Sequence, residues 1–214
     1  MEHSVPITMS DMVRAKAPTL FLKTRIIHDV YVTPRSADLE EQKTVLIREW
    51  AGTTEKQIDA HPLIIVYREL GRQLGSDPKL VPAVEGLYKR GILQGRFPTV
   101  NAVVDAANLV SARHFIPIGL FDFDKIEGAI ELALAAASDA FIPIGKEKPV
   151  VLMLDTPILR DAQGIFSAIG TRDSKRTMIT PESQNLLAVS WGIEGVDPAL
   201  VDAVLDECAL EVLK

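Results

Sequence analysis

The sequence has little cysteine, few aromatic residues and no long apolar run. A single cysteine, Cys208, in 214 residues excludes an internal disulfide. The longest apolar stretches, residues 129–137 and 186–191, are shorter than the roughly 18 residues that a membrane-spanning helix needs. The first residues show neither the basic start nor the apolar run of a secretory signal. We therefore expect a soluble, cytoplasmic protein with no membrane partner.

The common motifs of cofactor and metal chemistry are also missing. The sequence contains no phosphate-binding loop, no glycine-rich dinucleotide motif, no Gly-x-Ser-x-Gly turn and no pair of cysteines. Its four histidines, which are His3, His28, His61 and His114, are scattered without the spacing of metal ligands. We expect neither a cofactor nor a metal ion.

Acidic residues outnumber basic residues: the sequence has 29 Asp and Glu residues and 23 Lys and Arg residues, which gives a net charge of −6. Proteins that grip nucleic acid through its phosphates usually carry a basic surface, so we expect no DNA partner. A transient RNA contact needs only a few local cations. Short basic groups of this kind are most often solvated surface, and the sequence has two of them: Lys89, Arg90 and Arg96, and then Arg172, Lys175 and Arg176.

The residues that are present divide the chain into a helix-rich half and a strand-rich half. An extended segment at 19–32 precedes four predicted helices, at 36–52, 62–75, 82–91 and 98–110. Short apolar runs separated by Pro, Gly and Asp then predict strands, at 115–118, 129–134, 141–144, 150–154, 157–160, 165–169 and 186–191. A turn at 161–164 joins two of these strands, and Asp197 opens a last helix that buries Cys208. The pattern indicates an α+β fold.

Three short polar residues occur on the predicted helix that begins at Pro98. Asn101, Asp105 and Asn108 stand at i, i+4 and i+7. Asn and Asp are poor helix formers and are commonly kept for hydrogen bonding, although a solvated face gives the same pattern. Asp105 is the helix-borne candidate for a catalytic carboxylate, and it could equally cap or brace the core.

This helix opens a string of motifs that identifies a family. Val-Asp-Ala-Ala-Asn at 104–108, Pro-Ile-x-x-Phe-Asp at 117–122 and Asp-Lys-Ile-x-Gly at 124–128 follow one another. Together they resemble the tRNA-binding and editing module, called B-three/B-four, of the phenylalanyl-tRNA synthetase beta subunit. The segments 166–174, 176–180 and 186–191 resemble the loop and terminal strand of the same module.

The resemblance implies one compact domain over residues 1–214. Residues 80–192 would form the editing-module core, 1–79 an added amino-terminal part and 193–214 a final helix. We interpret the chain as a stand-alone form of the module, without the catalytic part of a synthetase.

In the family, a pocket at the junction of two subdomains binds the aminoacyl end of a mischarged tRNA and hydrolyses its ester. The substrate-binding positions that the match implies are Asn108, Gly119, Asp122, Ser167, Gly170, Thr171 and Ser174. Two positions depart from the family. Gly119 stands where the family has a histidine, and the family's pocket glutamate falls within residues 187–189, at Ala188 in the alignment we prefer.

Three functions fit these observations. The first is weak, transient binding of tRNA or aminoacyl-tRNA, with or without hydrolysis of the ester. Backbone N–H groups of the 168–172 loop would stabilise the oxyanion, and the phosphate contacts would be Lys89, Arg90, Arg96, Arg172 and Arg176. The second is binding of a free amino acid or a small metabolite. The third is an interaction scaffold whose pocket is filled by apolar side chains.

Overall fold

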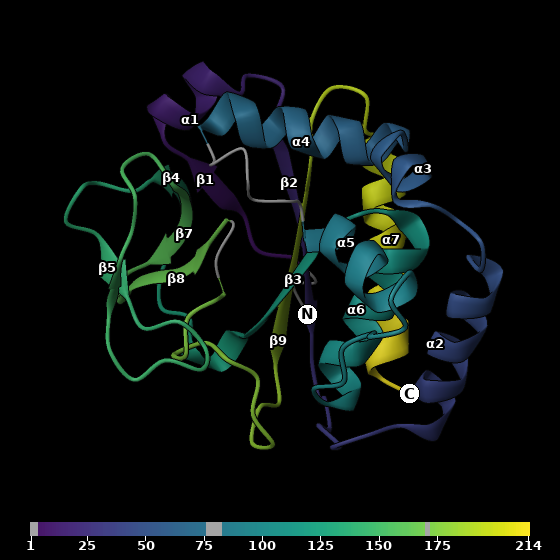
Figure 1. Ribbon diagram of the computed structural model, residues 1–214. Helices are drawn as coiled ribbons and strands as arrows, with labels where there is room; N and C mark the ends of the chain where they lie inside the picture. The colour runs from purple at the N-terminus through teal and green to yellow at the C-terminus, as the bar shows by residue number, and fades with distance from the viewer. Residues whose placement is uncertain (1–3, 76–82, 170–171) are drawn as a thin grey trace.

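A computed structural model describes residues 4–75, 83–169 and 172–214. Helices and strands are mixed, which confirms the predicted α+β class. A three-stranded sheet runs through the middle of the molecule, with a four-stranded sheet on one side and most of the helices on the other (Figure 1).

The central sheet is antiparallel and has the order β2-β9-β3. Its strands are β2 (Phe21–Ile27), β9 (Leu186–Gly192) and β3 (Ile118–Asp122). Because side chains alternate along a strand, the sheet has two faces. Lys23 and Arg25, on one face of β2, form ion pairs with Asp202 and Asp206 of the last helix, α7 (Pro198–Val212). That face therefore lies against helices, and the other face meets the second sheet.

The second sheet has the order β1-β4-β7-β8. Its strands are β1 (Ile7–Met9), β4 (Ile130–Leu134), β7 (Pro157–Asp161) and β8 (Gly164–Ala168). As predicted, a tight turn joins β7 to β8, and the Asp161 carboxylate accepts hydrogen bonds from the backbone N–H groups of Gln163 and Gly164. A small ribbon of β5 (Ala140–Phe141) and β6 (Val150–Val151) packs beside it.

The two amino-terminal strands join sheets built mainly from the second half of the chain. β1 pairs in parallel with β4, and β2 pairs antiparallel with β9. The helix-rich half is thus tied to both sheets. Pairing over such sequence distances leaves no local sequence signal, and β1, with only three residues, was not predicted.

Local signals placed several helices correctly. Helix α2 (Ala37–Glu49) begins after Ser36, whose hydroxyl accepts a hydrogen bond from the Leu39 N–H, and α4 (Pro62–Leu74) ends at Gly75 in the left-handed conformation. Helix α7 begins at Pro198 after the Asp197 cap. Two short helices, α1 (Asp11–Lys16) and α3 (Glu55–Asp59), lie between these elements.

Two other helices differ from the prediction. The predicted start at Pro82 lies outside the described residues, and α5 (Ala83–Gly86) continues as a π-helix, η1 (Leu87–Ile92). The expected Glu85–Lys89 ion pair is present at 3.0 Å. Helix α6 (Ala102–His114) begins four residues later than predicted, because Asn101 caps it by accepting a hydrogen bond from the Val104 N–H at 2.9 Å. Asn101 therefore shares no helical face with Asp105.

The strand predicted at 115–118 also begins later. Phe115 ends α6 in the left-handed conformation, with φ +56°, and β3 starts only at Ile118. A single-turn 3-10 helix, η2 (Phe123–Lys125), then follows β3.

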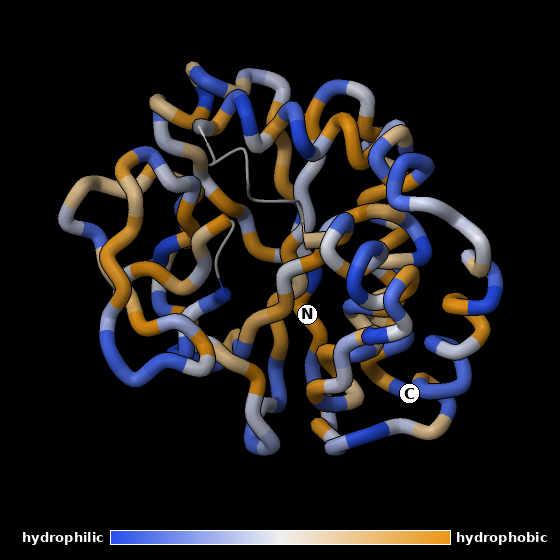
Figure 2. Tube along the Cα trace, viewed as in Figure 1, coloured by the Kyte–Doolittle hydropathy of each residue, from blue (hydrophilic) through white to orange (hydrophobic). Residues whose placement is uncertain are grey.

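Apolar side chains fill the space between the sheets and the helices. Figure 2 shows the hydrophobic residues concentrated along the central strands and on parts of the surrounding helices. The rings of Phe121 on β3 and Phe166 on β8 pack edge to face, with their centroids 5.0 Å apart, and this contact joins the two sheets. Cys208 is fully buried in this core, as predicted. Among the described helices, none is long and apolar enough to span a lipid bilayer.

Candidate functional site

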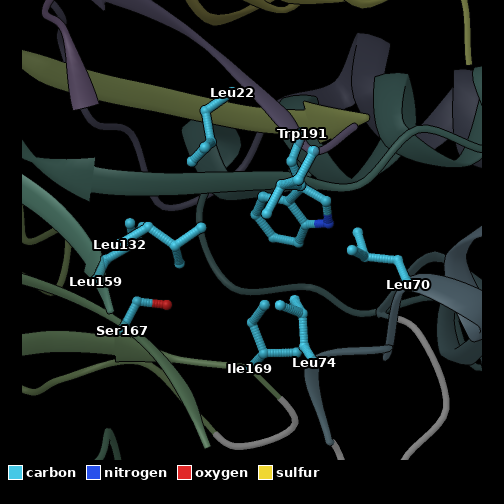
Figure 3. A pocket seen from close by; sticks show the side chains of 9 residues that line it. Leu22, Leu70, Leu74, Leu132, Leu159, Ser167, Ile169 and Trp191 are labelled. Atoms are coloured by element: carbon cyan, nitrogen blue, oxygen red, sulfur yellow. The ribbon is translucent and has the colours of Figure 1, made fainter. Parts of the chain in front are cut away.

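A narrow apolar slot lies between the two sheets, beneath α4 (Figure 3). Its cavity volume is about 20 Å³, close to the space of one water molecule. Leucine, isoleucine and tryptophan side chains form its walls, and one serine is its polar member: the lining is Leu20, Leu22, Leu70, Leu74, Leu132, Leu159, Ser167, Ile169 and Trp191.

Strand register and helical spacing bring these residues together. Leu22 of β2 stands opposite Trp191 of β9, so both side chains project from the same face of the central sheet. Leu70 and Leu74 are four residues apart on α4 and share a face. The Tyr67 hydroxyl donates a hydrogen bond to the Trp191 carbonyl oxygen at 2.9 Å, which holds α4 over the end of β9. Burial raises the pKa of Tyr67, so this donor stays protonated.

The slot has one polar lining residue, Ser167, and Asp173, which does not line the slot, is its hydrogen-bond partner. The Ser167 hydroxyl, at the slot in Figure 3, donates a hydrogen bond to the Asp173 carboxylate. Although Asp173 is only partly buried by surface area, the protein around its carboxyl group raises the pKa to about 6, and the Ser167 hydrogen bond opposes the shift. Sequence reasoning missed Asp173, whose only signal was its place between the candidates Arg172 and Ser174.

The predicted substrate positions divide between the two sides of the central sheet. Gly119 pairs with Val189, so it lies on the face that carries Trp191 and borders the slot side. A methyl group on Gly119 would come within 3.0 Å of the Phe121 ring. Ala188 alternates with Val189 and projects from the helical face. Within residues 187–189, Val189 is therefore the slot-side neighbour of Gly119, and Ala188 is not.

Asn108 lies on the helical side as well. It is half-buried on α6, which packs with α7 on the side of the central sheet away from β4, β7 and β8 (Figure 1). The structure thus brings Ser167 and Gly119 to the slot side and leaves Asn108 and Ala188 on the other. Gly170 and Thr171 lie outside the described residues.

Asp122 and Ser174 are buried and support the surrounding chain. The Asp122 carboxylate accepts a hydrogen bond from the Ser183 hydroxyl at 2.6 Å and pairs with the Lys125 ammonium at 3.0 Å. The Ser174 hydroxyl accepts a hydrogen bond from the Arg176 N–H at 3.2 Å. These contacts fix the loops that follow β3 and β8.

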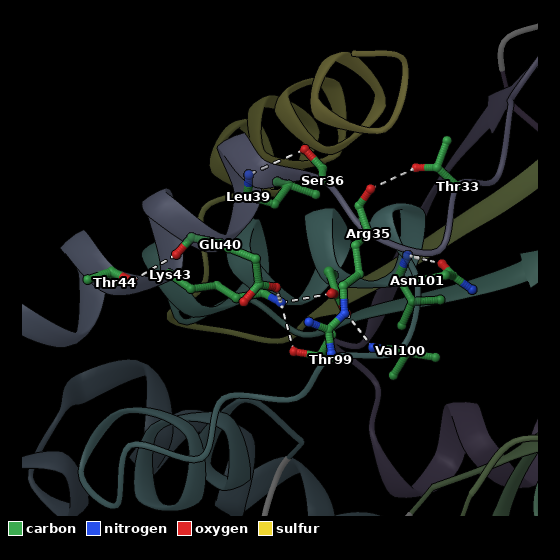
Figure 4. Close-up of polar contacts among 12 residues, drawn as sticks. Thr33, Arg35, Ser36, Leu39, Glu40, Lys43, Thr44, Thr99, Val100 and Asn101 are labelled. Carbon is green, nitrogen blue, oxygen red and sulfur yellow. Dashed lines mark hydrogen bonds and ion pairs between the residues drawn. The ribbon is translucent and has the colours of Figure 1, made fainter.

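Asp105 braces the core, which is one of the roles that the sequence left open for it. Its carboxylate is buried, pairs with the buried Lys43 ammonium at 2.7 Å and accepts a hydrogen bond from the Val100 N–H at 2.8 Å. Figure 4 shows the polar contacts around Lys43, which also reach Glu40 and Thr99. This network links α2 to the start of α6, so Asp105 is committed to a structural ion pair.

The predicted phosphate contacts also divide into two groups. Lys89 pairs with Asp59 at 2.7 Å and with Glu85 at 3.0 Å. Arg176 grips the Asp161 carboxylate with both terminal nitrogens and donates to two backbone carbonyl groups. The other three, which are Arg90, Arg96 and Arg172, are exposed.

Within residues 4–75, 83–169 and 172–214, no three His, Cys, Asp or Glu side chains are placed to hold a metal ion.

Comparisons with known proteins place this geometry in a family. The B3/4 domain matches residues 66–213, well over half of the chain. The phenylalanine–tRNA ligase beta subunits of Mycoplasma pneumoniae and Mycoplasma genitalium are 33% and 36% identical over 87 residues, which is 41% of this chain and 11% of theirs. The beta subunit from Neisseria meningitidis is 27% identical over 94 residues, 44% of this chain and 12% of its own.

A solved structure shares the fold. An amino-terminal fragment of the phenylalanyl-tRNA synthetase beta subunit from Pyrococcus horikoshii superposes with a TM-score of 0.51 and covers 98% of this chain and 49% of the fragment. Its sequence identity is 16%, so the likeness concerns the fold. Because the domain match covers well over half of the chain, the chain belongs to the B3/4 domain family.

Proposed function

We propose that this protein binds the aminoacyl end of a tRNA at the apolar slot, whose leucine and tryptophan side chains move apart to admit the amino-acid side chain. The observation that carries the proposal is the slot itself, an apolar space whose one polar lining residue is Ser167. Its position in a B3/4 domain supports an aminoacyl ligand, because the related proteins are ligases that act on tRNA.

The slot alone would give weak binding. Burying one apolar side chain contributes about 1.5–3 kcal/mol, which is far from a tight complex. Phosphate contacts from Arg90, Arg96 and Arg172 would supply the remainder, since these are the exposed members of the predicted set. The complex would then be transient and sensitive to salt.

Filter retention of charged and uncharged tRNA tests the proposal. Leu22→Phe adds volume inside the slot, and Leu210→Phe makes the same change on the exposed face of α7. We expect wild-type protein and Leu210→Phe to retain charged tRNA in preference to uncharged tRNA, and Leu22→Phe to lose that preference. Circular dichroism confirms that both variants are folded. Equal retention of charged and uncharged tRNA by the wild-type protein would refute the proposal.

The same incubation reports on hydrolysis. If the protein releases the amino acid from charged tRNA faster than buffer alone does, the protein is an aminoacyl-tRNA deacylase. Binding without release would make it a binding protein. Asp105 is held by Lys43, whereas Asp173 interacts with Ser167 of the slot wall.

Binding of a free amino acid or small metabolite is the second candidate. It is favoured by the ion pairs of Lys89 and Arg176, which occupy two of the five predicted phosphate contacts, and by the net charge of −6. A thermal-shift series with free amino acids separates the candidates, because a ligand that binds only the folded state raises the melting temperature. A shift with amino acids, together with no retention of tRNA, would favour this second function.

A further inference from the structure

We propose that this protein forms a weak homodimer, in which the outer edge of β6 pairs antiparallel with the same edge of a second copy. The ribbon of β5 and β6 lies on the side of the molecule away from α6 and α7 (Figure 1). Pairing about a twofold axis would join two such ribbons into one continuous sheet. The ribbon shares no residue with the slot lining, so this proposal is independent of the proposed function.

β6 is the outer strand of its ribbon. Beyond β5, the chain continues into residues 142–144, where the Lys175 N–H donates to the Ile142 carbonyl oxygen and the Ile144 N–H donates to the Asp173 carbonyl oxygen, both at 2.8 Å. Among the described strands, β6 has β5 as its one neighbour. The opposite edge of β6 is therefore open, and an open edge is a template for another strand.

The side chains along this edge are apolar and exposed. Residues 150–154 read Val-Val-Leu-Met-Leu, without a charged or polar side chain. Val151, Met153 and Leu154 have exposed fractions of 65%, 59% and 64%, whereas Leu152 is buried among residues of the second sheet. Proteins commonly guard an open edge with a charged side chain within the strand. This edge has no such guard, so it is suited to pairing.

The backbone groups of this edge match those of a second copy. The Leu152 N–H donates to the Asp139 carbonyl oxygen at 2.8 Å, so Leu152 directs its backbone groups to β5. By alternation, Val151 and Met153 direct their N–H groups to the open edge. In a pairing centred on Val151, the Val151 N–H of each copy donates to the Val151 carbonyl oxygen of the other, and Met153 comes to lie opposite Pro149.

The pair of Met153 and Pro149 supports this register. Proline has no N–H, so Pro149 offers no donor to the Met153 carbonyl oxygen opposite it. That carbonyl oxygen needs none, because it already accepts from the Thr156 N–H at 3.1 Å and from the Thr156 hydroxyl at 2.8 Å. The Met153 N–H donates to the Pro149 carbonyl oxygen of the second copy. The edge is thus complementary to itself.

The charges at the two ends of the run also favour antiparallel pairing. Lys146 and Lys148 precede β6, and Asp155 follows the run, so each copy brings its lysines toward the Asp155 of the other. The contribution is modest, because Asp155 also pairs with Lys16 at 3.0 Å. Glu147, which stands between the lysines, is paired within its own copy.

Analytical ultracentrifugation over a concentration series tests the dimer. We expect the mass of the wild-type protein to rise from 23.4 kDa toward twice that value, with a dissociation constant in the micromolar range or weaker. Val151→Lys should weaken the association by about 10-fold or more, because like charges would meet at the twofold axis. Leu210→Lys makes the same kind of change on the exposed face of α7 and should leave the association unchanged.

Cysteine cross-linking tests the register. Cys208, the single cysteine, is buried, so Val151→Cys provides one exposed thiol on each chain. Hydrogen-bonded residues that face each other across antiparallel strands have Cα atoms about 5.5 Å apart, within the range of a disulfide. Mild oxidation should therefore link Val151→Cys into a covalent dimer, and Leu210→Cys should stay largely monomeric.

Three results would overturn the proposal. The first is a wild-type protein that stays monomeric throughout the series. The second is a dimer that Val151→Lys does not weaken, or equal cross-linking of Val151→Cys and Leu210→Cys, since either would place the contact elsewhere. The third is a mass that climbs past twice the chain mass, which would indicate non-specific association of the apolar run instead of a closed pair.

Discussion

Asp173 combines two properties that seldom help folding, which are partial burial and a negative charge. Its folded pKa of about 6 lies above the ordinary value of 3.8, so the folded protein binds a proton more readily than the unfolded chain does. Stability therefore falls as pH rises from about 4 to 6 and stays lower above that range. A cost of this kind, retained beside a slot, is typical of a functional residue.

Replacing Asp173 with asparagine tests this cost. At pH 7.5 we expect Asp173→Asn to be more stable than the wild-type protein by about 1 kcal/mol, a figure reduced from the full shift because the group is partly exposed. At pH 4 the two should melt together. Thermal unfolding at both pH values measures the difference, with Glu147→Gln as the control. A variant less stable than the wild-type protein at pH 7.5 would contradict the assigned pKa direction.

Lys43 and Asp105 illustrate the opposite case, a buried charge that is satisfied. Lys43→Met removes the cation and leaves the Asp105 carboxylate buried against the Val100 N–H alone. We expect a loss of about 3–5 kcal/mol in the free energy of unfolding. The double variant Lys43→Met with Asp105→Leu should recover most of that loss, because no unpaired charge remains. Urea denaturation provides both values, and additive losses would show that the pair is not coupled.

At the scale of elements, capping residues determine where the helices begin. Asn101→Ala removes the side chain that accepts from the Val104 N–H, and should destabilise the protein by about 1 kcal/mol. Asn101→Asp keeps the acceptor and should stay close to wild type. Chemical denaturation of both variants checks the assignment. A stable Asn101→Ala variant would favour a helix that begins nearer Pro98.

The sequence predicted an element well where all its signals were local. Pro62 and Gly75 enclosed α4, and the Asp161–Gly164 turn gave the β7–β8 hairpin. At Pro98 two start signals competed, and the asparagine cap prevailed over the proline. β1 was missed because three residues carry no detectable period. The raised pKa of Asp173 arises from burial, which the sequence near Asp173 does not reveal.

At the scale of the whole molecule, the motif string led to the correct family, because its residues are contiguous in the sequence. The matching segments also contain Ser167, which lines the slot, while the roles of the predicted site residues stay predictions. The face of the central sheet that each β9 residue occupies is fixed by the pairing of β9 with β2 and β3. This pairing puts Val189, and not Ala188, on the slot side, and the sequence alone does not give it. Which arginines are engaged also depended on tertiary partners, as Arg176 and Asp161 show.

The distribution of cations leads to a final prediction about salt. If Arg90, Arg96 and Arg172 make the phosphate contacts, the logarithm of the tRNA association constant should fall with the logarithm of salt concentration with a slope of about −2, as three contacts to single-stranded RNA imply. The double variant Arg90→Ala with Arg96→Ala should flatten the slope to about −0.7 and weaken binding of charged and uncharged tRNA alike. Lys146→Ala with Lys148→Ala removes the same charge from the exposed loop before β6 and should leave the slope unchanged. Equal flattening by both double variants would mean that the net charge of −6, rather than these arginines, governs the encounter with RNA.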